Sequence, residues 1–182
     1  MKEILKKFSM VFLIAGIASL LAGIYGILHD QITYSISPEY YTKFKFIQFK
    51  LDEEYYSIRE KVTIVGFLAT WWFGLFLGLI LGIFGLRHKD WKTMLNVSMT
   101  SIFIALIVAF ITGIIGLLYG KFIVSNQPKS EFNHWYIPAH LIDFKNFISV
   151  GSMHNFSYAG GIIGLIAGLI YSFKKSRSAI LQ

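Results

Sequence analysis

The residues best suited to chemistry are histidines and their polar neighbours beside long apolar segments. Four of the five histidines lie in the two long connections between the segments that are apolar enough to cross a membrane, residues 29–61 and 120–155, and a carboxylate and an amide adjoin two of them. Together these candidate ligands are His29, Asp30, His134, His140, His154 and Asn155. Imidazole nitrogens and a carboxylate oxygen suit zinc, copper or another divalent ion, and two imidazoles can hold a haem iron axially. Histidines at a membrane surface also form hydrogen bonds to loop carbonyls, so both interpretations stay open.

Other reactive motifs are absent from the chain. There is no cysteine, which excludes disulfides, thiolate nucleophiles and iron–sulfur clusters. The histidines form no HExxH or HxxH pair, and Ser152, with Asp143 and His154 nearby in the sequence, is not presented by a nucleophile elbow. No phosphate loop, dinucleotide fingerprint or EF-hand occurs. We therefore predict no catalytic residue and no cofactor, with a bound metal ion or haem as the alternative.

The composition indicates that membrane helices position these ligands. The 182 residues are 55% hydrophobic and 15% charged, with a mean hydropathy of +0.59, whereas soluble domains are about 25% charged. Crossing about 30 Å of hydrocarbon takes roughly 20 apolar residues. Four segments without a charged side chain meet this requirement: 8–28, 62–86, 94–119 and 156–173. We predict an all-α membrane protein, a four-transmembrane-helix bundle, whose first span is retained rather than cleaved as a signal peptide.

The distribution of lysine and arginine indicates the orientation. The N-terminal segment, the connection between spans two and three, and the C-terminal segment hold nine cations against two acids, Glu3 and Asp90, so their net charge is +7. The other two connections hold eight cations and eight acids. Because cytoplasmic segments carry the positive excess, we predict a cytoplasmic membrane protein with both termini in the cytoplasm. The positive charge is thus an orientation signal, and nucleic-acid binding is excluded.

The two halves of the chain resemble each other at an offset of 90 residues. Identical residues occupy 21 of 92 pairs, well above the number expected from composition, and the register continues through the outer loops. Coincidence among glycine, leucine and isoleucine is the alternative. We predict one integral membrane domain, 1–182, built from two parallel-repeat helical hairpins related by a pseudo-two-fold axis along the membrane normal. The first repeat, 1–90, contains the outer loop 29–61; the second, 91–182, contains the outer loop 120–155.

Glycines at four-residue spacing predict how the spans pack. Small residues allow close van der Waals contact between helices, and such contact holds membrane helices together. The glycines on spans two and four are Gly74, Gly78, Gly82, Gly164 and Gly168. We expect these two faces to meet each other near the pseudo-axis, with the interface of a homodimer as the alternative.

The outer loops show the alternation typical of strands. From Gln31 to Leu51 apolar and polar residues alternate around a turn at Ser37–Pro38–Glu39, which predicts a β-hairpin. We expect both loops to form a small β-containing extracytoplasmic cap of about four strands, with a short interfacial helix after Pro138. Aromatic residues are abundant in it: Tyr40, Tyr41, Tyr55, Tyr56, Trp135 and Tyr136. They suit an aromatic belt and internal packing, or a surface that binds a partner.

Trp71 and Trp72 break the repeat near the outer end of the second span. Indole rings at this depth can line a pocket of the size of a lipid or a quinone, or pack between the helices and the cap. We expect packing, and keep pocket lining as the alternative.

The order of four spans with cytoplasmic termini and a β-rich first outer loop resembles the claudin arrangement. The claudin signature includes a cysteine pair, which this chain lacks, so no residue role is carried over. We expect a non-enzymatic protein of the lipid bilayer whose cap binds another membrane or extracytoplasmic protein, a further copy of itself, or a lipid-like ligand. The alternatives are a metal- or haem-binding enzyme or redox subunit, and a small transporter or oligomeric channel subunit.

Overall fold

The computed structural model describes residues 2–51 and 55–178, and it is helical throughout its regular parts. Four helices are long and apolar enough to cross a membrane, which confirms the prediction of an all-helical fold with four candidate membrane spans. Each begins or ends beyond the predicted span, because helix continues past the apolar window at most ends. The four helices are α1 (Lys2–Ile36), α4 (Ile58–Gly85), α5 (Trp91–Phe122) and α6 (Phe144–Ser178).

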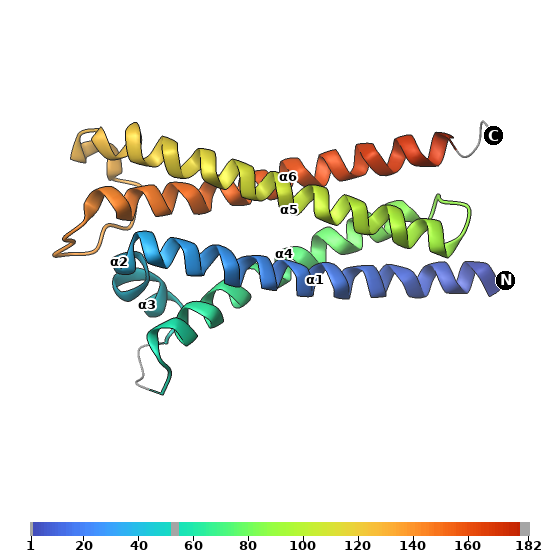
Figure 1. The fold of residues 1–182 in the computed structure, drawn as a ribbon, viewed down its shortest axis with the longest axis horizontal. Coiled ribbons are helices and arrows are strands. Elements are labelled where there is room, and N and C mark those ends of the chain that lie inside the picture. The colour runs from blue at the N-terminus through green and yellow to red at the C-terminus, as the bar shows by residue number, and fades with distance from the viewer. Residues whose placement is uncertain (1, 52–54, 179–182) are drawn as a thin grey trace.

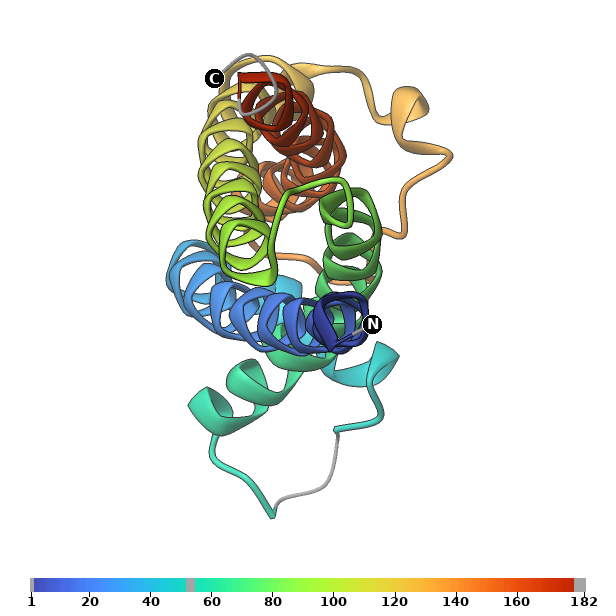
Figure 2. The same cartoon turned by 90° about the vertical axis from the view of Figure 1, so that its right-hand side faces the viewer.

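The helices pair as two hairpins that lie side by side. α1 packs along α4, and α5 packs along α6, while contacts between the two pairs are sparser. Figure 1 shows the elongated bundle, with the start of α1 and the end of α6 at the same end. The view along the bundle in Figure 2 separates the blue and green pair from the yellow and red pair. The seam between the pairs is where the candidate site lies.

Helix starts are specified by local capping chemistry. Ser57 and Glu60 form a reciprocal capping box at the start of α4. Asp90 accepts a hydrogen bond from the Thr93 N–H and caps α5 at 2.8 Å. The connection between α4 and α5 is also held by α1, because Glu3 accepts a hydrogen bond from the Trp91 N–H. Hydrogen bonds from both α1 and the connection itself therefore fix the start of α5 at this end of the bundle.

The predicted β-hairpin in the first outer loop is wrong. The chain leaves α1 at Ser37 and immediately becomes helical again, and no strand occurs in the described residues. The elements after Ser37 are α2 (Pro38–Tyr40), η1, a π-helical turn (Tyr41–Lys45), and α3 (Phe46–Gln48). Tertiary packing overrides the alternating pattern, because even Lys45 is buried here with 8% exposure.

The second outer loop also contains helical turns rather than strands. It holds η2 (Val124–Asn126) and η3 (Lys129–Phe132). The interfacial helix expected after Pro138 is the first part of α6, which starts at Phe144 instead of near residue 156. Asp143 accepts a hydrogen bond from the Asn146 N–H at 3.0 Å and caps this start. The β-containing cap is thus a helical cap, which lies over the hairpin ends and encloses a shared aromatic core. Its buried members are Tyr40, Tyr41, Phe46, Val62, Val65, Phe132, Phe147, Ile148 and Val150.

The glycines of spans two and four do not face each other as expected. Gly78 lies against Ala15 and Ala18 of α1, and Gly164 lies against Ala105 of α5. The remaining glycines follow the same division, with Gly74 and Gly82 against α1 and Gly168 against α5. Small residues therefore bring helices together within each hairpin.

Candidate functional site

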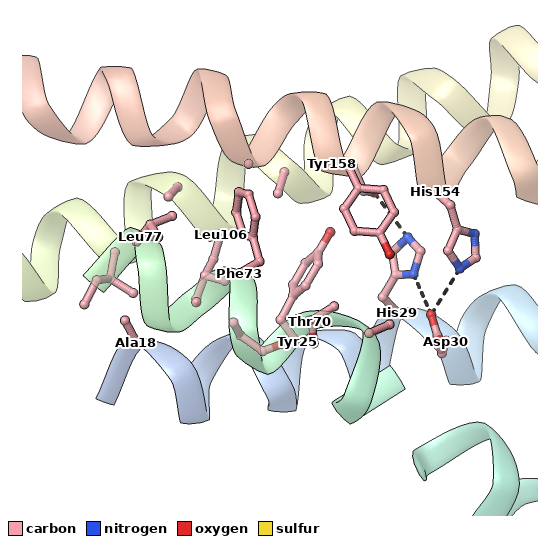
Figure 3. Close-up of a pocket in the computed structure, with 18 residues that line it drawn as sticks. Ala18, Tyr25, His29, Asp30, Thr70, Phe73, Leu77, Leu106, His154 and Tyr158 are labelled. Carbon is pink, nitrogen blue, oxygen red and sulfur yellow. Dashed lines mark hydrogen bonds and ion pairs between the residues drawn. The ribbon is translucent and has the colours of Figure 1, made fainter. Parts of the chain in front are cut away.

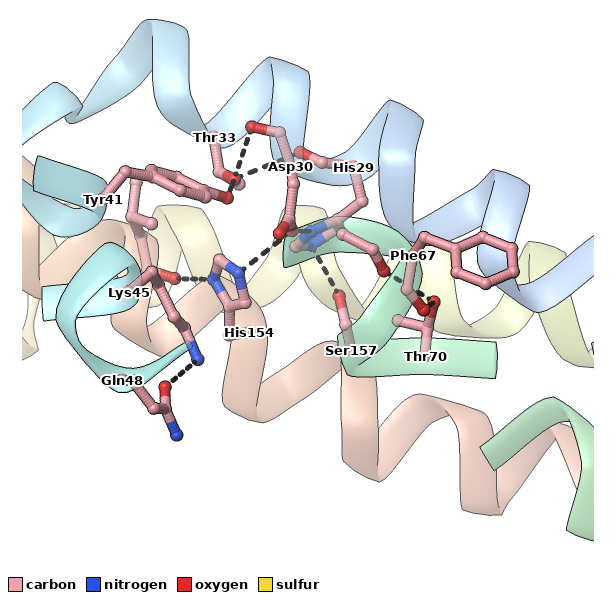
Figure 4. A network of polar contacts seen from close by, with 12 residues as sticks. His29, Asp30, Thr33, Tyr41, Lys45, Gln48, Phe67, Thr70, His154 and Ser157 are labelled. Atoms are coloured by element: carbon pink, nitrogen blue, oxygen red, sulfur yellow. Dashed lines mark hydrogen bonds and ion pairs between the residues drawn. The ribbon is translucent and has the colours of Figure 1, made fainter. Parts of the chain in front are cut away.

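Three of the six predicted ligands meet in the seam between the hairpins. His29 and Asp30 lie near the outer-loop end of α1, and His154 lies on the facing part of α6 (Figure 4). All three are buried, with exposures of 5%, 3% and 6%. One potential ligand atom from each lies within 4.8 Å of the others, and this is the only such group in the part of the chain that the structure describes. The fold thus assembles two imidazoles and a carboxylate from different hairpins.

Asp30 lies at the centre of this cluster. Its Oδ1 is 3.1 Å from His29 Nδ1 and 3.3 Å from His154 Nε2. Its second oxygen, Oδ2, is buried and has no hydrogen-bond partner among the described residues. Leaving a buried carboxylate oxygen without a donor costs free energy. The cluster therefore contains a negatively charged group that its protein neighbours satisfy only in part.

The orientation of His154 follows from its other contact. Its Nδ1 is 2.9 Å from the carbonyl oxygen of Val150, one turn earlier in α6. A carbonyl only accepts, so Nδ1 carries the hydrogen and donates it. In a neutral imidazole the other nitrogen then has no hydrogen, and its lone pair points at Asp30 Oδ1. Two lone pairs at this distance repel unless a positive charge, either a second ring proton or a metal ion, is shared between them.

His29 is oriented by a hydroxyl from the opposite hairpin. Its Nε2 lies 3.2 Å from Ser157 Oγ, one turn beyond His154 in α6. A serine hydroxyl can donate or accept, so His29 can present either a hydrogen or a lone pair to Asp30. Both ring nitrogens of His29 therefore have partners in either state.

Aromatic rings close the cluster on the side of the cap. Tyr40 stacks on His154 with centroids 4.9 Å apart, and the rings of His29 and His154 meet edge to face at 4.8 Å. Tyr41 shares a 2.6 Å hydrogen bond with Thr33, one turn after Asp30. The cap thus excludes solvent from the cluster and strengthens the electrostatic interactions within it.

A buried cation lies in the same cap. The ammonium group of Lys45 donates to Gln48 Oε1 at 3.0 Å and lies 5.0 Å from the centroid of the Phe44 ring (Figure 4). Burial lowers the pKa of Lys45, and the negative charge of Asp30 opposes that shift. The carboxylate and the ammonium are therefore close enough to affect each other without forming an ion pair.

An apolar cavity of about 60 Å³ adjoins the cluster and is bounded by all four long helices (Figure 3). The cluster forms its polar end together with Ser157, while Phe73, Leu77 and Leu106 line the apolar part. Tyr25 also lines it, and the buried Tyr25 hydroxyl has no hydrogen-bond partner among the described residues. This volume is large enough for a few water molecules next to the cluster.

The other predicted site residues lie elsewhere. His134 and His140 are exposed in the second outer loop, and Asn155 is exposed on α6. Trp71 and Trp72 are 38% and 45% exposed and do not line the cavity between the hairpins. Phe73 of the same helix lines this cavity instead, and pocket lining by the tryptophans stays a prediction.

The sequence interpretation missed Tyr25, Ser157 and Tyr40. Helical periodicity carries a signal for the first two, because Tyr25 precedes His29 by four residues and Ser157 follows His154 by three, which places each pair on one helix face. Tyr40 was assigned to a predicted strand. Only the helical cap brings its ring onto His154.

Comparison with protein-family models, with curated proteins and with solved structures finds no match. The resemblance to claudins therefore extends to the order of the four spans only, since the expected β-rich loop is helical. The chain is an all-helical protein with four candidate membrane spans and a buried His–Asp–His cluster. Any function must therefore be inferred from the geometry of that cluster.

Proposed function

We propose that the protein binds one divalent transition-metal ion of the zinc class through His29, Asp30 and His154. The orientation of His154 carries the proposal. Its Nδ1–H is held by the Val150 carbonyl, so the lone pair on Nε2 faces a carboxylate oxygen. A metal ion supplies the positive charge that this arrangement needs. Metal-bound histidines commonly donate their other N–H to a backbone carbonyl in the same way.

The spacing of the ligand atoms supports a small ion. Zinc bonds to histidine nitrogen and carboxylate oxygen are about 2.0–2.1 Å long, which places neighbouring ligands of a tetrahedral ion about 3.3–3.4 Å apart. The two contacts of Asp30 Oδ1 are 3.1 and 3.3 Å. The adjoining cavity leaves room for water as a further ligand. Nitrogen and oxygen donors without thiolates favour Zn²⁺ or a similar divalent ion over Cu⁺.

Haem fits this site poorly. A porphyrin held by both imidazoles must lie between them, but Asp30 lies there and the adjoining cavity measures about 60 Å³. We therefore propose a metal ion and not haem.

The ion's role is to join the two hairpins. His29 and Asp30 come from the first and His154 from the second, whereas the close glycine contacts lie within each hairpin. A bound ion thus supplies a strong link across a seam that contains a cavity. The function is that of a non-enzymatic membrane protein whose metal ion holds the hairpins, and the cap above them, in one arrangement.

Metal analysis of the purified full chain tests this proposal. After exposure to Zn²⁺ and removal of excess, elemental analysis gives about one zinc per wild-type chain and close to none for Asp30→Asn or His154→Ala. The matched control is His140→Ala, which removes an exposed histidine and leaves binding unchanged. Zinc-free wild type, or equal zinc in all variants, contradicts the proposal and assigns the shared positive charge to a proton on His154.

A second function is supported by exposed apolar residues on the outer loops. Tyr55 is 84% exposed, Tyr136 59% and Ile142 91%. Such residues supply binding energy at protein interfaces, which favours docking of another membrane or extracytoplasmic protein. Mild crosslinking of cells with wild type and with Tyr55→Ser/Ile142→Ser tests this function. A specific adduct lost in the double variant supports it, and a self-adduct identifies the partner as a second copy.

A further proposal concerns the orientation of the chain in the membrane. The start of α1 and the end of α6 lie at one end of the bundle, which supports termini on one side, and the charge asymmetry assigns that side to the cytoplasm. A reporter that is active only outside the cell, fused after α6, tests this orientation. Activity of that reporter contradicts it.

We also propose that the two hairpins are internal repeats, from the 90-residue offset in the sequence and from small-residue contacts that are similar in both hairpins but displaced along the second helix of each. Gly78 lies against Ala15, and Gly164 lies against Ala105. The contact residues of α1 and α5 are thus 90 positions apart (105 − 15), the same as the offset in the sequence. Those of α4 and α6 are 86 positions apart (164 − 78), which is about one helical turn less. The same offsets relate a second contact to its counterpart: Val11 with Gly82, and Ser101 with Gly168.

A further inference from the structure

A groove on the outside of the bundle adjoins the His29–Asp30–His154 cluster through His29. It has a volume of about 880 Å³, within the range of about 300–1,000 Å³ typical of ligand pockets. α1 contributes Leu28 and Ile32, and α5 contributes Leu106, Ile107 and Phe110. These side chains are apolar and border the groove where the bundle faces the bilayer. The groove therefore suits a hydrocarbon chain.

The outer end of the groove is polar and positively charged. Arg59, in the first turn of α4, reaches across to α1 and donates from Nη1 to the Gln31 backbone carbonyl and to Gln31 Oε1, at 3.1 and 2.9 Å. It also donates from Nη2 to Ser35 Oγ at 3.2 Å and lies 4.5 Å above the Tyr34 ring. All of these partners are neutral. Within residues 2–51 and 55–178, no carboxylate lies within ion-pair distance of this guanidinium.

Arg59 is thus held in place by neutral partners, and no carboxylate among the described residues pairs with its charge. A guanidinium has five N–H groups, and the contacts to Gln31 and Ser35 use three of them. The remaining two can form charge-assisted hydrogen bonds with a phosphate, which are among the stronger polar interactions in proteins. A negative headgroup at this end and an apolar chain along α1 and α5 complement the groove in charge and in polarity.

We propose that this groove binds one anionic phospholipid, with its phosphate at Arg59 and an acyl chain along Ile107 and Phe110. Tyr25 and His29 form the inner wall of the groove and also line the buried cavity. The lipid thus covers the His29 side of the His–Asp–His cluster. The lipid site does not require the metal ion, because neither Arg59 nor the α5 residues belong to the cluster.

Native mass spectrometry of the detergent-purified full chain tests the proposal, with phosphatidylglycerol as the anionic probe and phosphatidylcholine as the zwitterionic one. A chelator is present, so the result does not depend on metal binding. Wild type retains one phosphatidylglycerol in preference to phosphatidylcholine, and Arg59→Gln lowers its retention about tenfold, the effect of losing one charged contact. The charge-matched control is Lys61→Gln on the same helix, which does not line the groove and leaves retention unchanged.

A second pair of variants tests the position of the acyl chain. Ile107→Trp fills the groove and abolishes retention, whereas Ile111→Trp, one turn further along α5 and outside the groove, leaves it intact. Only variants that are monodisperse and as helical as wild type are compared. Equal retention of both lipids, equal behaviour of Arg59→Gln and Lys61→Gln, or full retention by Ile107→Trp overturns the proposal.

Discussion

The ring of His154 meets the ring of His29 edge to face, with centroids 4.8 Å apart and planes at 88°. The two histidines belong to different hairpins, and Asp30 Oδ1 lies within 3.3 Å of a nitrogen of each. Any positive charge at this position, whether a proton or a metal ion, therefore acts on both hairpins at once. The stability of the seam depends on the charge state of the cluster.

We expect metal binding at the proposed site to stabilise the wild-type fold. A ligand at 100 times its Kd that binds only the folded state raises the free energy of unfolding by about 2.7 kcal/mol. We expect this gain with Zn²⁺ in denaturant titrations of the wild type in detergent, and no gain for Asp30→Asn. His140→Ala keeps the full gain, because His140 lies outside the cluster. An equal response of Asp30→Asn and wild type shows that zinc binds elsewhere.

Glycine contacts within the hairpins are sensitive to one added methyl group. A Cβ at Gly164 lies 2.6 Å from the Ala105 Cα, so Gly164→Ala forces α5 and α6 apart and lowers the free energy of unfolding by about 1–3 kcal/mol. Gly16→Ala is the matched control, because nothing lies within 4 Å of a Cβ at that position. Unfolding titrations compare the two variants. Equal stability of both is incompatible with the close approach of α5 and α6.

Glu39 links the two outer loops, and its contribution depends on pH. Its carboxylate accepts hydrogen bonds from Lys43 and from the N–H groups of Ile142 and Asp143. Desolvation raises the pKa of Glu39, but these hydrogen bonds outweigh it and lower the pKa from 4.5 to about 2. The folded state binds fewer protons, so the contribution is complete above pH 4.5 and is lost as the pH falls through about 2.

Hydrogen exchange at the Ile142 and Asp143 amides measures this link. Protection, corrected for the intrinsic exchange rate, stays constant above pH 4.5 and falls below it in the wild type. Glu39→Gln removes the charge, so its protection at pH 6 is already reduced and changes little on acidification. A wild type whose protection at these amides does not change down to pH 2 shows that the carboxylate does not hold the loop.

His88 makes the opposite end of the bundle sensitive to mild acid. Its Nε2 lies 3.0 Å from Ser172 Oγ, which joins the connection between α4 and α5 to α6. Burial lowers the pKa of His88 below 6.5, and the positive charges of Arg87 and Lys7 add to the shift while Asp90 opposes it. The folded state therefore favours the neutral ring. Its stabilisation is present above pH 6.5 and is lost as the pH falls through the lowered pKa.

Thermal unfolding at pH 7.5 and 5.5 isolates the effect of His88. We expect the wild type to lose more stability between these values than His88→Gln, which cannot gain a proton at this position. His140→Gln, which removes an exposed histidine, loses as much as the wild type. If His88→Gln and the wild type respond equally, the His88 contact does not depend on pH in this range.

The sequence was a reliable guide wherever one segment determines its own structure. Each apolar segment must satisfy its backbone hydrogen bonds within itself to cross a bilayer, so the four spans follow from local composition. The histidine and carboxylate types also limited the chemistry before any fold was known. His29, Asp30 and His154 were among the predicted ligands for that reason.

Local patterns were a poor guide wherever two segments share a surface. The alternation around Pro38 predicted strands, but the segment is helical, with Tyr40 buried against α6 and Tyr41 buried against α1. Regular glycine spacing identified close packing without identifying the partner helix, since spacing carries no information on which helix lies opposite. Both errors concern contacts between elements, which depend on the tertiary arrangement.

Residue types and span lengths alone thus determine that this chain has four helices able to cross a membrane, with candidate metal ligands near the ends of two of them. The tertiary structure decided which ligands meet: it rotates α1 and α6 so that His29, Asp30 and His154 face the seam, and leaves His134, His140 and Asn155 exposed. The physical reason is that hydropathy acts on each segment separately, whereas a site between hairpins depends on the rotation and register of two helices packed against each other.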